Sequence, residues 1–344
     1  MQRILVIRID FLGDMVCTTA LIHALKLRWP HAEIHVLANK YNQSVLARNP
    51  DVATIHTYVY SKQCERNLLP GRFRAIFDRL ALIWRLRHLG FDLLLIPNGG
   101  MNKNSIQFAK QLNVADRRWH TTETEFDDRN LEHVATRPIH HEALSGFALM
   151  CGSGQVDINS LKLNIYPEPQ LQTKWRAALG EKGRPRIGLF ISNKSTQRHW
   201  SWEKWRQLAL KLNQQADLLI FHDPIEQPTE QQLAGLTARC LSTPSIDDLV
   251  AAMSQLDLVI SADSAPVHIS SALQIPVVAL FESRPEKYLR WYPLGVRHVV
   301  VHAGPQVEDI TVDAVASAAR TLLITDDNPI VANRELKPEC TPSI

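Results

Sequence analysis

The stretch RILVIRIDFLGDMVCTTALIHALK, residues 3–26, decides the fold of the first half of the chain. Its opening run, Arg3–Ile9, is mostly apolar, which predicts a buried strand. A short loop with Gly13 follows, and residues 14–29 have helical spacing. A buried strand that leads directly into a helix is the repeating unit of parallel α/β sheets.

The same alternation continues to about residue 100. Further elements are expected as strands at Glu33–Asn39, Thr54–Val59 and Asp92–Pro97 and as a helix at Arg72–Leu89. The polar segment Asp116–His141 breaks the pattern and predicts a long loop, followed by a helix up to Cys151.

The alternation starts again after a boundary between Asn164 and Arg186, where YPEPQ and EKGRPR indicate turns. Strands are expected at Arg186–Ser192, Asp217–His222, Arg239–Ser242, Leu258–Ser261 and Pro276–Phe281. Helices are expected at Glu203–Gln214, Ile246–Leu256, Ala265–Leu273 and Val312–Leu323.

This repetition predicts an α/β protein with two Rossmann-like, doubly wound domains. The expected organisation is an N-terminal domain over 1–165, a linker over 166–185, a C-terminal domain over 186–325 and a tail over 326–344. Ligands of such sheets bind outside the carboxyl ends of the strands, so two facing domains are expected to enclose a cleft.

Composition narrows the class of protein. The 344 residues carry a net charge of only +3, which does not favour a nucleic-acid partner. The five cysteines have neither zinc-site nor redox spacing, and the chain opens without a basic, apolar leader. No apolar run approaches the roughly 20 residues of a membrane span. A cytoplasmic protein is therefore expected.

The loop after the first strand contains two candidate carboxylates. Asp14 lies where a carboxylate can act as a general base toward an acceptor hydroxyl, or simply stabilise the start of a helix. Asp10, in the same loop, competes for the role of base or orders the turn. Gly13 lets the backbone approach a ligand closely.

The segment ISADSAPVHISSAL, residues 260–273, predicts an anion site. A buried strand leads through Asp263 to a helix start at Ser264 and Ala265, where free backbone N–H groups and a hydroxyl can hold a diphosphate. Ser264 can also cap the helix. His268 lies one turn further and either reaches the same ligand or packs under the sheet.

The segment SNKSTQRHWSWEKW, residues 192–205, follows the first strand of the second half. Lys194, Arg198 and His199 are candidates for phosphate contact, with a solvated loop as the alternative. The three tryptophans are expected to be packing anchors.

Residues 61–91 form a basic stretch with seven cations against two carboxylates. Such a run is usually a solvated face, but Arg66, Arg72 and Arg74 are also candidates for contact with a phosphorylated glycolipid acceptor or an anionic membrane surface. No GxGxxG, Walker A, GxSxG or HExxH motif is present, and no metal site is expected.

At these residues the chain resembles the glycosyltransferase family 9 heptosyltransferases. The resemblance extends from Arg3 to about Leu323 and is most specific in residues 3–26, in ISADSAPVHISSAL and in RHWSWEKWRQLA. It implies a GT-B fold and an inverting, metal-independent transferase without a cofactor. In such enzymes the acidic residue of the Gly-Asp loop, here Asp14, is the proposed base.

The resemblance also implies a donor site. The family's basic residue before His-Trp is Arg198 here, where many members have Lys. The family's Asp-Thr-Gly phosphate loop corresponds to residues 263–265, with Ala265 replacing Gly, and His268 matches. Glu226 or Glu230 is implied as the ribose contact, and the two are not distinguished.

The function that this resemblance implies is transfer of a heptose from ADP-heptose to a phosphorylated lipopolysaccharide core acceptor. Peripheral contact with the cytoplasmic face of the inner membrane is a further expectation. The alternatives are a transferase that uses another nucleotide sugar, a nucleotide-sugar epimerase, and a non-catalytic nucleotide-sugar-binding protein on the same fold.

Overall fold

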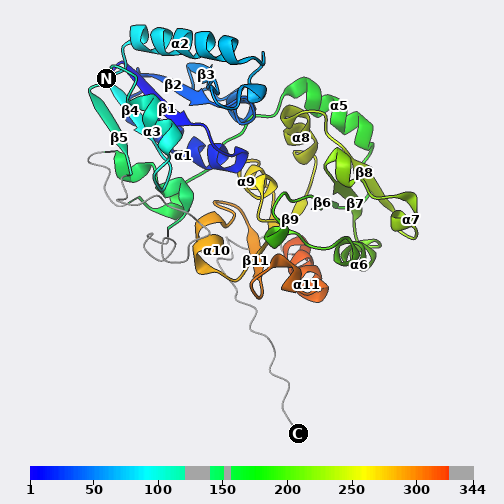
Figure 1. Cartoon of the computed structure of the whole chain (residues 1–344). Helices are drawn as coiled ribbons and strands as arrows, with labels where there is room; N and C mark the ends of the chain where they lie inside the picture. The colour runs from blue at the N-terminus through cyan, green and yellow to red at the C-terminus, as the bar shows by residue number, and fades with distance from the viewer. Residues whose placement is uncertain (121–139, 151–155, 325–344) are drawn as a thin grey trace. The chain divides into compact units, whose positions relative to one another are not determined.

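The computed structural model describes residues 1–120, 140–150 and 156–324, and the chain divides into two compact units, Met1–Tyr166 and Pro167–Ile344. Each unit is built on its own parallel sheet covered by helices (Figure 1). The α/β class predicted from the sequence is confirmed.

Unit 1 has a five-stranded parallel sheet in the order β3-β2-β1-β4-β5. Its strands are β1 (Arg3–Arg8), β2 (Glu33–Ala38), β3 (Thr54–Thr57), β4 (Leu93–Ile96) and β5 (Asp116–Trp119). Its helices are α1 (Leu12–Arg28), α2 (Arg72–Leu89) and α3 (Lys103–Ala109). Short 3₁₀ turns occur at η1 (Gln43–Leu46), η2 (Cys64–Arg66), η3 (Glu142–Leu144), η4 (Phe147–Leu149) and η5 (Ile158–Ser160).

Both faces of β1 are buried, as its apolar run predicts. Leu5 and Ile7 pack with buried residues of α2 and α3 in one core. Because side chains alternate along a strand, Ile4 and Val6 point to the opposite face, where α1 contacts β1 and β2. The strand therefore delivers its last residue, Arg8, to the carboxyl end of a rigid sheet.

Unit 2 has a six-stranded parallel sheet in the order β11-β10-β9-β6-β7-β8. Its strands are β6 (Arg186–Phe190), β7 (Asp217–Phe221), β8 (Ala238–Leu241), β9 (Leu258–Ala262), β10 (Val277–Phe281) and β11 (His298–His302). Its helices are α5 (Pro169–Leu179), α6 (Trp202–Leu212), α7 (Glu230–Leu233), α8 (Ile246–Met253), α9 (Ala265–Ala272), α10 (Pro285–Trp291) and α11 (Val312–Ile324). Its 3₁₀ turns are η6 (Thr196–Arg198), η7 (Pro224–Glu226) and η8 (Val307–Asp309).

Helices α6 and α11 share one core of unit 2 with apolar side chains of β6, β7, β9 and β10. Helix α9 contacts β9 and β10, so its first turn follows directly from the carboxyl end of β9. The loops at this end of the sheet carry the residues that the sequence predicts for the donor site.

Two expectations for residues 116–150 are corrected. The first four residues of the expected loop form the edge strand β5, because their backbone pairs with β4 even though the sequence DRRW has little apolar character. The expected helix before Cys151 is replaced by the short turns η3 and η4. Residues 121–139 of the loop, like the tail over 326–344, lie outside the described residues.

The range 166–185, expected as a linker, contains helix α5. Its proline at the first turn has the backbone angle that a helix start needs, and the helix packs against α8 of unit 2. Most of this range therefore belongs to the second unit as an ordered element.

Candidate active site

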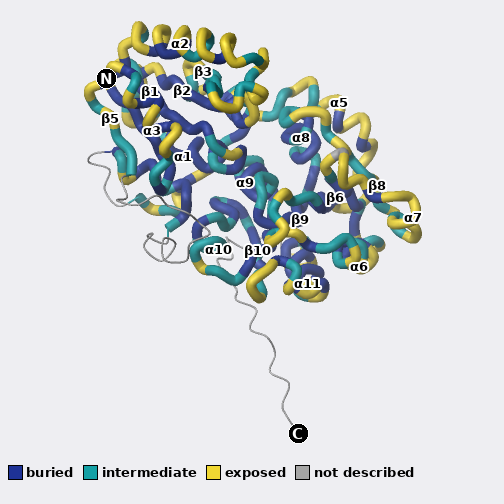
Figure 2. Tube along the Cα trace, in the orientation of Figure 1, coloured by how far each residue is buried: buried dark blue, intermediate teal, exposed yellow. Residues whose placement is uncertain are grey.

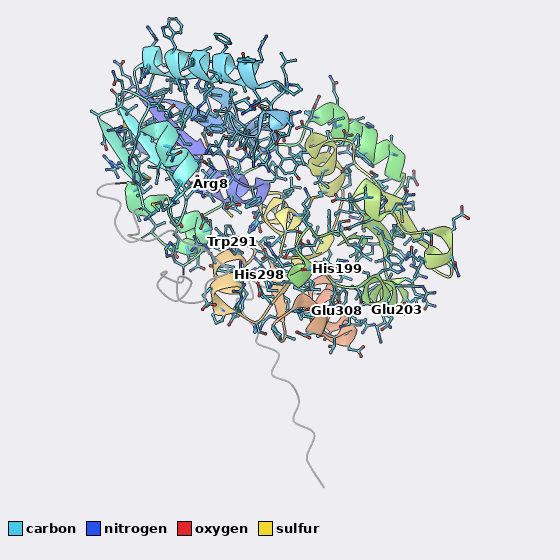
Figure 3. All side chains as sticks on the ribbon, viewed as in Figure 1. Arg8, His199, Glu203, Trp291, His298 and Glu308 are labelled. Carbon is cyan, nitrogen blue, oxygen red and sulfur yellow. The ribbon has the colours of Figure 1, made fainter. Side chains whose placement is uncertain are left out.

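The centre of the site in unit 1 is a buried arginine. Arg8 is only 1% exposed and lies at the carboxyl end of β1 (Figure 3). Its Nε donates to Oδ1 of Asp10 at 2.8 Å. Its Nη2 donates to Oε1 of Glu142 at 3.0 Å and to Oδ1 of Asp14. One guanidinium thus holds three carboxylates from three separate segments of the chain.

The two candidate bases differ in how their oxygens are occupied. Both oxygens of Asp10 accept hydrogen bonds, one from Arg8 and one from Nδ2 of Asn98 at 2.5 Å. Asp14 accepts from Arg8 through Oδ1, and within the described residues its Oδ2 has no hydrogen-bond donor. The side chains of Asp10 and Asp14 are equally exposed, at 15%, so only the occupancy of their oxygens distinguishes them. Asp14 is therefore the carboxylate with an oxygen available to a substrate.

Burial and crowding change the proton affinity of this cluster. Burial, together with repulsion from Asp10, raises the pKa of Asp14 to about 8, although Arg8 acts in the opposite direction. Burial also raises the pKa of Asp10. For Arg8, burial opposes the charge, but the surrounding carboxylates outweigh it and raise the pKa well above its ordinary value. The pKa of Asp14, at about 8, is therefore much closer to neutral pH than that of an ordinary carboxyl group, which suits a general base.

The start of α1 differs from the expected loop. The helix begins at Leu12 with Phe11 as its N-cap, so Gly13 and Asp14 lie in its first turn. No side chain caps this helix, so Asp14 is not its cap, but Asp14 is the acidic residue of the first turn, where a carboxylate stabilises a helix start. The carboxylate pairs with Arg8, because a buried unpaired cation would be far less favourable than an uncapped helix end.

The site in unit 2 is centred on Asp263, which directly follows β9 and is 6% exposed. Nη1 of Arg198 lies 3.3 Å from both the carbonyl oxygen and Oδ2 of Asp263. Burial raises the pKa of this carboxyl above its ordinary value, whereas Arg198 and Lys287 act to lower it. Nδ2 of Asn193 donates to the same carbonyl at 3.1 Å. The structure thus brings Arg198 and Asp263 together.

The start of α9 offers fewer free donors than the sequence predicts. Pro266 has no N–H, and the N–H of Val267 donates to the carbonyl of Ser264 at 3.1 Å. The side chain of Ser264 does not cap the helix, because its Oγ bonds the carbonyl of Ala262 at 2.9 Å and Oγ of Ser261 at 3.0 Å. At this helix start, the N–H of Ala265 and the hydroxyl of Ser264 therefore stay the candidates for anion contact.

Two further candidates for phosphate contact lie in different environments. His268 is 3% exposed and packs edge-on against Trp291, with ring centroids 5.7 Å apart. Lys194 is exposed in the loop that precedes η6. Their contact with phosphate stays a prediction, as does that of Gly13.

The tryptophans of residues 200–205 are packing anchors, as expected. Trp200 and Trp205 are each 1% exposed and meet edge-to-face at 4.8 Å between centroids. Nε1 of Trp200 donates to the carbonyl of Ile310 at 3.1 Å. Trp202 packs partly buried against the same core. This packing holds the short turn η6, and with it Arg198, at the carboxyl end of β6.

A cavity of about 260 Å³ beside α6 distinguishes the two ribose candidates. Glu226 lines this cavity together with His199, Trp202, Trp205 and Gln232, whereas Glu230 is not among its lining residues. A larger cavity, of about 730 Å³, lies at the amino ends of β6 and β9, away from Asp263. The geometry therefore favours Glu226 over Glu230 for a ligand contact.

The acceptor candidates lie on and before α2. Arg66 ends the turn η2, and its guanidinium lies over the ring of Tyr60 at 5.7 Å. Arg74 pairs with Asp78 one helical turn away, at 2.9 Å. Arg72 is exposed at the start of the helix. Their contact with an acceptor stays a prediction.

Sequence reasoning missed Arg8, Asn98 and Glu142. A signal existed for Arg8, because a charged residue in a buried strand needs a partner. No local signal marks Glu142, which lies 134 residues from Arg8. Lys287, which acts to lower the pKa of Asp263, was also missed.

Within residues 1–120, 140–150 and 156–324, no group of three or more His, Cys, Asp or Glu side chains is arranged to hold a metal ion.

Comparison with known proteins places the chain in a family. The model of glycosyltransferase family 9 (heptosyltransferase) matches residues 81–317. Lipopolysaccharide heptosyltransferase 3 of Escherichia coli K12 is 24% identical, over 96% of this chain and 97% of that protein. Lipooligosaccharide heptosyltransferase 2 of Haemophilus influenzae is also 24% identical, over 83% and 85% of the two chains.

Solved structures share the fold. A family 9 glycosyltransferase from Veillonella parvula has a TM-score of 0.75 at 19% identity, covering 94% of this chain and 97% of that one. The E. coli heptosyltransferase WaaC with ADP has a TM-score of 0.70 at 14% identity, covering 93% and 100%. These likenesses confirm the predicted GT-B fold.

Proposed function

Because the chain belongs to glycosyltransferase family 9 (heptosyltransferase), we propose that it transfers a heptose from ADP-heptose to a lipopolysaccharide core acceptor. The names of the curated relatives support both the sugar and the acceptor. The transfer inverts the anomeric carbon and needs neither a metal ion nor a cofactor.

The observation that carries this proposal is the environment of Asp14. Its carboxylate has one oxygen held by Arg8 and the other available, and its pKa is raised to about 8. Asp14 accepts the proton of the acceptor hydroxyl while that oxygen forms a bond to the anomeric carbon. The bond from this carbon to the diphosphate breaks, and ADP leaves with the electron pair.

The donor half of the proposal rests on the groups around Asp263. Arg198 and the helix start at Ser264 and Ala265 stabilise the negative charge of the departing diphosphate, and Asp263 orients Arg198. Lys194, His268 and Gly13 add contacts to the donor phosphates. Glu226 holds the ribose, in keeping with its place beside a cavity.

The acceptor is proposed to be a phosphorylated glycolipid, bound through Arg66, Arg72 and Arg74. Lipopolysaccharide core precursors present phosphate groups that a guanidinium can bind with two hydrogen bonds. A cytoplasmic enzyme at the inner membrane would meet both substrates. In the described parts of the chain, no helix is long and apolar enough to cross a membrane.

The experiment that tests the proposal is a donor screen. Purified protein is incubated with ADP-heptose or UDP-hexoses and a delipidated core acceptor, with and without a metal chelator, and products are followed by mass spectrometry. We expect a heptose mass added to the acceptor and no effect of the chelator. Transfer only from a UDP donor would contradict the heptose, and conversion of the donor without acceptor would favour an epimerase.

A further inference from the structure

Helix α2 has an apolar face on each of two opposite sides. Its inner face is buried in the core of unit 1 through Ala75, Leu82, Ile83 and Leu86. Its outer face exposes Phe73 (81%), Ile76 (49%), Phe77 (70%), Leu80 (57%) and Trp84 (64%). Figure 2 shows this division as a buried inner side and an exposed outer side along the length of α2.

The exposed apolar residues form a continuous stripe. Phe73, Phe77, Leu80 and Trp84 follow one another at intervals of four, three and four residues, which is the spacing of one helix face. Ile76 lies beside them. Single exposed apolar residues are common, but an ordered stripe over a helix of roughly 27 Å, at 1.5 Å per residue, marks an interaction surface.

Cations flank this stripe. Arg72 and Arg85 are exposed and make no ion pair with any described residue, whereas Arg74 pairs with Asp78. Arg87 donates through Nε to the carbonyl of Gln111, and among the described residues it forms no ion pair with a carboxylate. The surrounding residues 61–91 contain seven cations and two carboxylates. The surface that covers this stripe should therefore be negatively charged.

The apolar stripe and the arginines beside it favour an anionic lipid surface as the partner of α2. An apolar stripe with Trp and Phe between arginines is typical of helices that lie in the interface of an anionic membrane. A second copy of this chain would place two positively charged faces against each other, which repulsion disfavours. A lipid surface with negatively charged headgroups satisfies both the apolar stripe and the cations.

We propose that α2 is a membrane-docking helix. It lies parallel to an anionic phospholipid bilayer, with the stripe from Phe73 to Trp84 among the upper acyl chains and Arg85 at the lipid phosphates. Docking does not depend on the transferase activity, so the two proposals fail or succeed in separate experiments.

The test is flotation of the full chain with lipid vesicles. The vesicles contain either phosphatidylcholine alone or phosphatidylcholine and phosphatidylglycerol in equal amounts. We expect flotation with the anionic vesicles and about tenfold weaker binding to the neutral ones, because both the stripe and the cations contribute. Equal binding to both vesicles, or to neither, would overturn the proposal.

Variants identify the surface. Phe77→Asp combined with Trp84→Asp is expected to abolish flotation, and Arg85→Glu to weaken it about fivefold or more at low salt. Leu27→Asp in α1 is the matched control, because Leu27 is 68% exposed but lies outside the stripe, and it should float like the unmodified protein. If the double variant floated as strongly as the unmodified protein, the membrane contact would have to lie outside the stripe on α2.

Two further measurements separate lipid binding from misfolding and from self-association. The double variant should keep its melting temperature and its activity on a delipidated acceptor, which shows that it is folded. The unmodified protein should sediment as the same species as the double variant. A self-association that disappears in the variant would assign the stripe to a second copy of the chain and overturn membrane docking.

Discussion

The buried guanidinium of Arg8 forms an ion pair with Asp14 in the first turn of α1, through the same nitrogen that donates to Glu142. Three carboxylates, including Asp10, share this single cation. Burial, and then repulsion from Asp10, raises the pKa of Asp14 to about 8. Strand β1, which lies at the centre of the sheet of unit 1, thus also carries the arginine that pairs with the proposed base.

Replacing Arg8 should destabilise the protein strongly. Arg8→Met leaves Asp10, Asp14 and Glu142 without their cation, and we expect the free energy of unfolding to fall by about 3–5 kcal/mol in urea titrations. Arg74→Leu is the control, because it breaks the exposed pair with Asp78 and should cost about 0.5 kcal/mol. Equal losses of unfolding free energy in both variants would mean that the buried ion pairs of Arg8 stabilise the fold no more than the exposed pair of Arg74 does.

The pH dependence of transfer should follow the charge of Asp14. The base must be deprotonated, so kcat/KM should rise with pH and level off above an apparent pKa of about 8. Asp10→Asn removes a repulsion that raises this pKa, so the rising limb should move to lower pH. Asp51→Asn, which changes a carboxylate paired with His23, should leave the profile in place. A shift to higher pH in Asp10→Asn would contradict the assignment.

The contact between Arg198 and Asp263 should matter for the diphosphate. Arg198→Ala is expected to lower kcat about 10²–10³-fold, and Arg198→Lys should recover part of the loss because it keeps the charge. Arg184→Ala, at the exposed pair with Asp217, should leave kcat unchanged. If the alanine variant at position 198 were as active as the protein with Arg, the leaving group would have to be stabilised elsewhere.

The ribose contact can be assigned by comparing two glutamates. Glu226→Ala should weaken ADP binding by about 10–100-fold, the effect of losing a hydrogen bond to a charged group, as measured by calorimetry. Glu230→Ala should change the affinity less than about twofold, because Glu230 does not line the cavity. The opposite order of effects would exchange the two assignments.

Most of the fold was predictable because it is encoded locally. The bounds of α2 match the expected Arg72–Leu89, and β1, β9 and β10 lie within one or two residues of their apolar runs. Strand β5 was missed because Asp116–Trp119 is stabilised by backbone pairing with β4 rather than by apolar side chains. Helix α5 was missed because its two buried side chains, Trp175 and Leu179, give a weak pattern.

The candidate site was predictable only in part. Asp14 and Asp263 follow buried strands in short motifs, which local sequence reveals. The partners that determine their proton affinity come from distant positions, as with Glu142 beside Arg8 and Arg198 beside Asp263. Such contacts depend on tertiary packing, and for this reason the raised pKa of Asp14 could not be anticipated from the sequence.

The most direct test of the proposed base is the kinetics of Asp14→Asn with ADP-heptose and a delipidated core acceptor. The variant keeps the shape of the side chain but cannot take a proton. We predict that kcat falls by about 10²–10⁴-fold while the affinity for ADP stays unchanged. A variant that transfers heptose at the unmodified rate would contradict the central claim, because the acceptor proton would then have to go to another group.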